Sequence, residues 1–265
     1  MEQSGILSAK KRLVIKVGTA VLTQDGQLAF NRMQNLVDLI AKLKNEKDLQ
    51  VILVSSGAVG AGYTSLKLDK KIVANKQALA AIGQPLLMKH YKKRFKEHNI
   101  TCAQMLFIAD DFDSRKRSKN AQDVMEILLE NKILPIINEN DVIATEELVF
   151  GDNDQLAAHV AYYFKADMLA ILSDIDGYYN KNPREFNDAV LQKNVSSIPV
   201  EELQMKHSAN SEFATGGIVT KLKAANFLME KDIPMYLTSG FDLKNAYDFL
   251  VDGNHKSGTL FQAKN

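Results

Sequence analysis

Short, continuous runs of apolar residues recur along the chain, and most of them are rich in β-branched side chains. Runs of this length and composition are typical of strands that are buried on both faces of a parallel sheet. The sequence predicts such strands over residues 12–19, 50–55, 101–107, 133–137, 168–172 and 235–237, with residues 258–261 as a last edge strand.

Between these runs, apolar residues recur three or four positions apart, which is the spacing of one face of an amphipathic helix. In residues 31–44 this spacing follows Asn31, a candidate N-cap. A Gly-Gln-Pro sequence at residues 83–85 predicts that the helix over residues 72–98 is broken or restarts there. Further helices are expected over residues 120–131 and 152–164, after residues 214–221 as far as residue 231, and over residues 243–250. Strands that alternate with helices predict an α/β fold, a three-layer αβα sandwich around a mainly parallel central sheet.

The composition excludes several classes of protein. There are 33 lysine and arginine residues against 32 aspartate and glutamate residues, so the whole chain has no bias toward nucleic acid or an anionic membrane. The single cysteine, Cys102, excludes an intramolecular disulfide. No apolar run is long enough to span a membrane and residues 1–12 lack the apolar core of a signal peptide, so we expect a cytoplasmic protein. Without a repeat or an obvious linker, residues 1–265 are expected to form one domain.

Residues 86–98 carry a cluster of lysine and arginine side chains on one helix face. A nucleic-acid-binding surface and an ordinary solvated helix face would both explain this cluster. The balanced total charge favours the solvated face, and we expect no nucleic acid partner.

Residues 214–221 are the first candidate for chemistry. Gly216 and Gly217 permit positive φ angles and close approach of the backbone to a ligand, and Thr220 and Lys221 follow as the chain enters a helix. Backbone N–H groups at a helix start, beside an ammonium group, form a binding site for phosphate. The segment lacks the GxxxxGK[ST] spacing of a P-loop, and an ordinary helix start with a solvated lysine explains it equally well.

Polar residues gather directly after several of the apolar runs. They are Lys16, Ser56 with Gly57, residues 138–141, Ser173 with Asp174, and residues 238–240. In open α/β sheets, ligands bind outside the carboxyl ends of the strands. One polar strand end would be an ordinary turn, but several on one edge indicate a binding site.

Lys16 lies inside a Val-Ile-Lys-Val run, where an unpaired ammonium group is costly to bury. Its stem could instead extend to solvent at the end of the sheet. Asp141, Asp152, Asp154 and Asp174 taken singly have simpler explanations as helix-start or turn residues. Considered together with two lysines and two glycine-rich loops, they favour phosphoryl transfer, in which lysines and Mg²⁺ neutralise the charge on the transferring group.

Six motifs occur in one order: Lys-Val-Gly-Thr, Ser-Ser-Gly-Ala-Val, Ile-Asn-Glu-Asn-Asp, Phe-Gly-Asp-Asn-Asp, Ser-Asp-Ile-Asp-Gly-Tyr-Tyr and Thr-Gly-Gly-Ile-Val-Thr-Lys. In this order they resemble the amino acid kinase family, and within it the members that phosphorylate glutamate; the resemblance spans residues 10–261. It implies ATP-dependent phosphorylation of the γ-carboxylate of L-glutamate with Mg²⁺, the first step of proline biosynthesis. It also implies a homo-oligomer, inhibition by proline, an N-terminal part that binds the amino acid and a C-terminal part that binds ATP.

The same resemblance implies roles for individual residues. It places Lys16 and Lys221 at the transferring phosphoryl group as catalytic residues, with Asp154 orienting both lysines. For the nucleotide it implies contacts with Lys16, Ser173, Asp174, Thr215, Gly216, Gly217, Ile218, Val219, Thr220 and Lys221. For the amino acid it implies contacts with Ser56, Gly57, Ala58, Asn138, Asp141, Asn153 and Asp154. It assigns no protein ligand to the metal.

The sequence departs from the family pattern in places. Ala214 stands where the family usually has glycine, Ile218 where it has methionine, and Ser173 where it has threonine, and none of these changes removes a charge. The chain ends soon after residues 258–261, where many relatives continue into a PUA domain, so we expect no such domain.

Two alternative functions remain open at this point. Another amino acid kinase would act on acetylglutamate or aspartate, and a catalytically silent sensor would keep the fold alone. Both lysines and Asp154 are present, which weighs against the silent form. Asp141 with two nearby asparagines suits a free α-ammonium group, which acetylglutamate lacks. A substrate carboxylate is already a nucleophile, so the reaction requires no general base.

Overall fold

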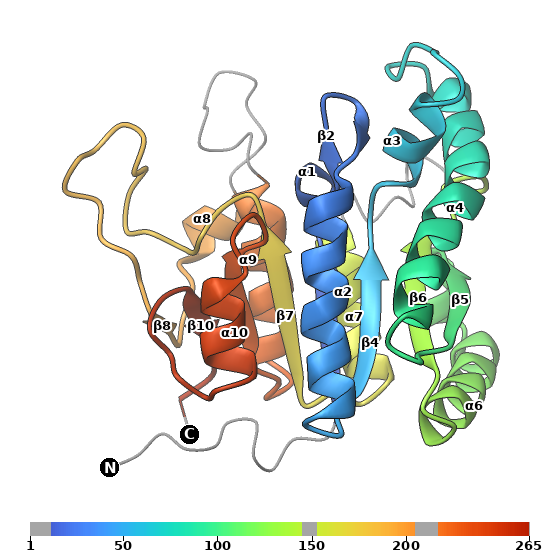
Figure 1. Ribbon diagram of the computed structural model, residues 1–265. Coiled ribbons are helices and arrows are strands. Elements are labelled where there is room, and N and C mark those ends of the chain that lie inside the picture. Colours follow the sequence, from blue (N-terminus) through green and yellow to red (C-terminus); the bar gives the residue numbers. More distant parts are fainter. Residues whose placement is uncertain (1–11, 145–152, 205–216, 265) are drawn as a thin grey trace.

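The computed structural model describes residues 12–144, 153–204 and 217–264, and these residues form a central sheet of eight strands (Figure 1). The strand order is β5-β6-β4-β1-β7-β9-β10-β8. Neighbouring strands are parallel, except that β9 and β10 are antiparallel. The strands are β1 (Arg12–Val17), β4 (Gln50–Ser55), β5 (Cys102–Phe107), β6 (Leu134–Glu139), β7 (Met168–Ser173), β8 (Asn194–Val195), β9 (Met235–Ser239) and β10 (Thr259–Phe261).

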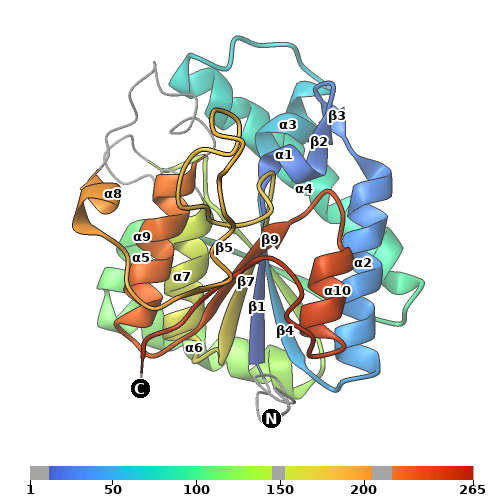
Figure 2. The same cartoon turned by 90° about the vertical axis from the view of Figure 1, so that its left-hand side faces the viewer.

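Helices cover both faces of this sheet, which confirms the predicted three-layer αβα architecture (Figures 1 and 2). One layer holds α2 (Phe30–Asn45), α4 (Val73–Lys96) and α10 (Lys244–Leu250). The other layer holds α6 (Arg115–Glu130), α7 (Asn153–Tyr163) and α9 (Ile218–Met229). Shorter elements are α1 (Thr19–Leu22), α3 (Ala58–Tyr63), α5 (Ala109–Asp113), α8 (Val200–Gln204) and a hairpin of β2 (Thr23–Gln24) and β3 (Gln27–Leu28).

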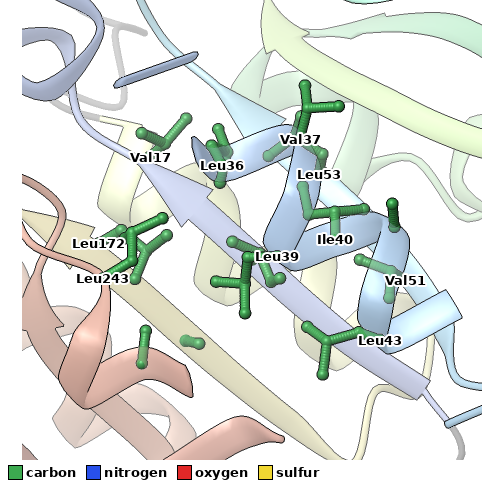
Figure 3. Packing of buried hydrophobic residues seen from close by; sticks show 14 of the residues in the cluster. Val17, Leu36, Val37, Leu39, Ile40, Leu43, Val51, Leu53, Leu172 and Leu243 are labelled. Atoms are coloured by element: carbon green, nitrogen blue, oxygen red, sulfur yellow. The ribbon is translucent and has the colours of Figure 1, made fainter. Parts of the chain in front are cut away.

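The central strand β1 contributes to two separate hydrophobic clusters, because successive side chains of a strand point to opposite faces. Val17 belongs to the cluster on the α2 side, where it lies near Leu36 (Figure 3). Val14 belongs to the cluster on the α7 and α9 side. Lys16 is two residues from Val14, so its side chain points into the layer of α7 and α9. The pleat of one strand thus decides which helices Lys16 can reach.

The predicted strands are present, but residues 258–261 do not form an edge strand. β10 lies between β9 and β8, so it has a neighbour on each side. Its partner β8 was not among the predicted strands, and Val195 of β8 aligns with Phe261 of β10. A strand of two residues is too short for hydrophobic periodicity to reveal, which is why the sequence pattern missed it.

The helix over residues 72–98 is not broken at its proline, contrary to the prediction. α4 is continuous, with Pro85 inside it. Pro85 and Ala81, the residue whose carbonyl loses its helical donor, both lie on the exposed side of the helix. Water can therefore satisfy that carbonyl, and the buried face of the helix is undisturbed.

Two sequence signals near the start of α2, a turn and a helix cap, differ in how well they agree with the structure. Asp25 and Gly26 adopt positive φ angles of 51° and 72° in the turn between β2 and β3, as the Asp-Gly pair predicts. Asn31 does not cap α2, because the helix begins at Phe30 with Ala29 in the cap position. Burial of the apolar face of α2 stabilises the helix instead of a side-chain cap.

The glycine-rich segment after β4 forms the short helix α3 rather than an open loop, and α3 crosses α4 in backbone contact. A Cβ atom on Gly62 would lie 1.9 Å from the carbonyl oxygen of Leu79, and one on Gly83 would lie 1.8 Å from that of Ala58. Real Cβ atoms never approach so closely, so Gly62 and Gly83 are required by this crossing.

We predict that Gly83→Ala lowers the free energy of unfolding by about 1–3 kcal/mol, because the added methyl group must push α3 away from α4. Ala81→Ser, on the exposed side of the same helix, should change it by less than about 0.5 kcal/mol. Equilibrium denaturation in urea measures both values. Equal stability of the Gly83→Ala variant and the unchanged protein would contradict the role given to this crossing.

Candidate active site

Two lysines from distant parts of the chain meet at one buried carboxylate. The Nζ atom of Lys16 lies 2.5 Å from Oδ1 of Asp154, and the Nζ atom of Lys221 lies 3.0 Å from Oδ2. The three residues are 2%, 0% and 3% exposed in the order Lys16, Asp154, Lys221. The predicted convergence of these side chains at the carboxyl edge of the sheet is confirmed as geometry, and their catalytic roles stay a prediction.

Three secondary-structure elements hold this cluster in place. Lys16 is near the end of β1, Asp154 is in the first turn of α7, and Lys221 is in the first turn of α9. Gly217, with a φ angle of 64°, starts α9, and its carbonyl oxygen accepts a hydrogen bond from Lys221 at 3.3 Å. The hydroxyl of Thr220 lies 2.9 Å from Oδ2 of Asp154, which adds a neutral contact on the same carboxylate.

The charge of the cluster suits a polyanion. Burying a lone ammonium or carboxylate group is costly, and the shared carboxylate of Asp154 reduces that cost for both lysines. Two ammonium groups against one carboxylate leave one net positive charge at the end of the sheet. The N-terminus of α9, a helix of 12 residues, contributes further partial positive charge beside Lys221.

A cleft of about 600 Å³ opens in front of the two lysines. It lies at the end of β1, whose neighbours are β4 on one side and β7 on the other. From β1 the sheet is extended in one direction through β4 and in the opposite direction through β7. Such a topological switch point is where open α/β sheets bind ligands. The predicted site residues that line it are Lys16, Ser56, Gly57, Ala58, Asn138, Asp141, Asn153, Ser173, Asp174, Gly217 and Lys221.

The remaining predicted site residues lie elsewhere. Ile218 lines a second cavity, described below. Val219 is buried in the hydrophobic cluster under α9, and Thr220 contacts Asp154 rather than the cleft. Thr215 and Gly216 lie outside the described residues.

A chain of side-chain amides supports one wall of the cleft. The Nε2 atom of Gln84 donates to Oε1 of Gln104 at 3.1 Å, and Nδ2 of Asn138 donates to Oε1 of Gln84 at 2.9 Å. The Nδ2 atom of Asn153 then donates to Oδ1 of Asn138 at 2.8 Å. The chain thus connects the edge strand β5 with α4, β6 and the start of α7.

Two backbone groups fix the direction of this amide chain, because a backbone N–H only donates and a carbonyl only accepts. The N–H of Glu139 donates to Oδ1 of Asn138 at 2.9 Å, and Nδ2 of Asn153 donates to the carbonyl of Ser55 at 3.1 Å. Asn153 therefore directs its donors into the protein and leaves its Oδ1 as an acceptor. Asn138 is bonded at both ends of its amide, so it acts as a support for Asn153.

Asp141 forms another part of the cleft wall. Burial raises the pKa of Asp141 above its usual range, and the positive charge of Lys76 partly opposes this rise. Sequence reasoning missed Lys76, Lys70 and Glu139, which also line the cleft. Glu139 carried a signal, since it belongs to the polar run of residues 138–141 at the end of β6, whereas the two lysines follow no strand and carried none.

A second cavity of about 230 Å³ adjoins the cleft at Asp174, which lines both. Its wall includes Ile175, Gly177, Tyr179 and Ile218, so it is more apolar than the cleft. The hydroxyl of Ser173 donates to Oδ1 of Asp174 at 2.9 Å, which fixes the carboxylate between the two spaces.

The fold is shared with kinases of known structure. A carbamate kinase from Giardia lamblia, solved with AMP-PNP, superposes with a TM-score of 0.66 at 18% sequence identity, over 97% of this chain and all of the other. At this identity the likeness establishes the fold alone, a three-layer α/β kinase fold.

Sequence comparison is more specific. Residues 11–239 match the profile of the "Amino acid kinase family". A glutamate 5-kinase of Wolinella succinogenes is 56% identical over 255 residues, which are 95% of this chain and 97% of that relative. A glutamate 5-kinase of Leishmania donovani is 52% identical over 98% of each chain. The chain therefore belongs to the amino acid kinase family and, within it, to the glutamate 5-kinases.

Two features are absent from the described residues. None of their helices is both long and apolar enough to cross a membrane. They also contain no group of three histidine, cysteine, aspartate or glutamate side chains placed to hold a metal ion.

We predict that Asp154→Asn lowers the free energy of unfolding by about 3–5 kcal/mol, because it leaves two buried ammonium groups without their counter-charge. Asp48→Asn is the matched control: it breaks an exposed 3.2 Å ion pair with Lys132 and should cost less than about 1 kcal/mol. Urea denaturation at neutral pH measures both. A loss of similar size in the two variants would show that the buried cluster does not depend on Asp154.

Proposed function

We propose that this protein transfers the γ-phosphoryl group of ATP to the γ-carboxylate of L-glutamate, giving L-glutamyl 5-phosphate and ADP. The observation that carries the proposal is the buried cluster of Lys16, Asp154 and Lys221 at the head of the cleft. The high identity to glutamate 5-kinases over nearly the whole chain supports the same reaction, the first step of proline biosynthesis.

The reaction brings two anions together, and the lysines suit that task. The γ-carboxylate is ionised near neutral pH and attacks the γ-phosphorus without a general base, while the bond to the ADP oxygen breaks. Lys16 and Lys221 stabilise the charge on the transferring group, and Asp154 holds their Nζ atoms in fixed positions. Because the cluster is buried and preorganised, little rearrangement is needed when the charge develops.

The far end of the cleft suits a free α-ammonium group. Asp141 supplies a carboxylate, and the locked amide of Asn153 presents only an acceptor. An N-acetylated substrate has no ammonium group and would place an apolar methyl group against these acceptors. This favours glutamate over acetylglutamate, and it assigns Asn138 to the support of Asn153 rather than to the substrate.

The nucleotide belongs on the side of Ser173 and Asp174. We assign the phosphates to Lys16, Gly217 and Lys221 in the cleft and the base to the more apolar second cavity. Mg²⁺ in kinase sites is held by one or two carboxylates together with the phosphates, and Asp174, which lines both spaces, fits that donor set. Bound there, Mg²⁺ would neutralise phosphate charge.

The proposal includes further features that the sequence and the family resemblance predict. They are a single domain over residues 1–265 with an N-terminal amino acid site and a C-terminal ATP site, a cytoplasmic location, a homo-oligomer, and feedback inhibition by proline. The sheet order agrees with this division, since Ser56, Asp141 and Asn153 lie on the β4 and β6 side and Asp174 follows β7.

We predict that the purified protein releases ADP from ATP and Mg²⁺ only when L-glutamate is present. Turnover with N-acetylglutamate or aspartate should be lower by at least about tenfold, because a missing or misplaced partner leaves buried polar groups unpaired. Lys221→Ala should remove glutamate-dependent turnover while the variant stays folded by circular dichroism. Faster turnover with acetylglutamate, or no turnover with any of the three, would overturn the proposed function.

We also predict an acid-side loss of glutamate affinity that belongs to Asp141. Burial raises the pKa of Asp141, so as the pH falls this carboxylate is protonated earlier than an ordinary one and can no longer bind an ammonium group. The KM for glutamate should therefore rise while the KM for ATP is constant. Asp141→Asn should have a high glutamate KM at every pH and lack this acid-side rise. A variant that retains the rise would assign it to another group.

A further inference from the structure

Recognition of a free amino acid needs a positive group as well as a negative one, because the substrate head carries an α-ammonium and an α-carboxylate. The site described so far supplies acceptors for the ammonium. No cationic side chain has yet been assigned to the α-carboxylate. On the basis of the proposed function, we therefore expect a cation on the cleft wall.

Four ammonium groups line the cleft: Lys16, Lys70, Lys76 and Lys221. Lys16 and Lys221 are bound to Asp154, where the reaction itself requires them. Only Lys70 and Lys76 are then available, among the described residues, for the other end of the substrate.

The surroundings of the two remaining lysines differ. Lys70 lies in the turn before α4, with its Nζ atom 3.9 Å from the centre of the Tyr63 ring, a cation–π contact. Lys76 lies in the first turns of α4, and among the described residues it has no ion-pair partner. Lys76 can therefore bind an incoming anion without breaking an existing interaction.

The fold holds Lys76 beside Asp141. The next residue of the helix, Gln77, donates from Nε2 to the carbonyl oxygen of Ala144 at 3.1 Å, which joins this turn of α4 to the loop after β6. Asp141 belongs to that loop, and Lys76 is the charged group that acts on its pKa. A carboxylate and an ammonium group thus face the same end of the cleft, each opposite in charge to one group of the amino acid head.

We propose that Lys76 binds the α-carboxylate of the substrate and that Lys76 and Asp141 together recognise the zwitterionic head of a free amino acid. The γ-carboxylate then points toward Lys16 and Lys221. Lys76 is a specificity-determining residue: it contributes binding energy at the end of the substrate away from the reacting phosphorus, so it acts on KM rather than on kcat.

The test compares Lys76→Met with Lys70→Met, two changes that each remove one cleft lysine. Lys76→Met should raise the KM for glutamate roughly ten- to hundredfold, the effect of losing one charge-assisted hydrogen bond. Its kcat at saturating glutamate and its KM for ATP should stay within about twofold of the unchanged protein. Lys70→Met should leave the glutamate KM within about twofold, as expected for a charge that is already in a cation–π contact with Tyr63. Lys76→Arg should recover part of the affinity.

A second measurement separates the α-carboxylate from the rest of the substrate. 4-Aminobutyrate has the ammonium group and the distal carboxylate of glutamate but lacks the α-carboxylate. Its inhibition constant against glutamate should be the same in the Lys76→Met variant and the unchanged protein.

The outcomes distinguish the two proposals. An unchanged glutamate KM in Lys76→Met, an equal effect of Lys70→Met, or an equal loss of 4-aminobutyrate binding would overturn the role of Lys76. Absence of glutamate-dependent turnover in the unchanged protein would instead overturn the proposed function. A lower melting temperature alone, with the KM unchanged, would assign Lys76 to stability and also reject the inference.

Discussion

The site depends on one carboxylate shared by two lysines. Without Asp154, the side chains of Lys16 and Lys221 would repel each other in a place largely shielded from water, and neither would have a defined position. With it, both lysines have a counter-charge and a defined position, and two lysines against one carboxylate give a surplus of positive charge. The sheet and two helices contribute one member each, so the cluster can form only when the α7 and α9 layer is packed on β1.

Around this cluster, neutral amide groups decide whether the cleft presents hydrogen-bond donors or acceptors. The orientations of the side-chain amides from Gln104 to Asn153 are fixed by hydrogen bonds with the backbone groups of Ser55 and Glu139. An asparagine in solvent could offer a donor or an acceptor, but a locked one offers only an acceptor. The buried amides behind Asn153 thus decide which group of Asn153 is presented to the cleft. The glycine contact between α3 and α4 holds the loop of Ser56 against the same helix that carries Lys76.

The sheet was predictable from the sequence because it leaves local signals, since short continuous apolar runs identify strands. A lysine inside such a run is unusual enough to indicate a site, but its convergence with Asp154 and Lys221 was implied by the family resemblance and not by a local pattern. The amide chain leaves no local signal. Its hydrogen-bonded pairs are 15 to 54 residues apart in the sequence, and each member is an ordinary polar residue in its own helix or strand. Lys76 was missed for the same reason: one lysine on a solvated helix looks like any other until the loop of Asp141 is placed beside it. The predicted helix break at Pro85 was wrong because the position of Pro85 on the exposed face is decided by tertiary packing.

The place of β10 in the sheet affects how the protein is made. During synthesis the ribosome releases β1, β4, β5 and β6 first, and the pairs among these four strands can form once β6 has emerged. β8 and β9 emerge later but are not neighbours, and they are joined only by β10, about 20 residues after β9. These four strands can therefore pair on the ribosome while β8 still lacks its partner. A shortened chain that loses Thr259–Phe261 would leave unpaired backbone groups on β8 and β9, a surface that favours aggregation.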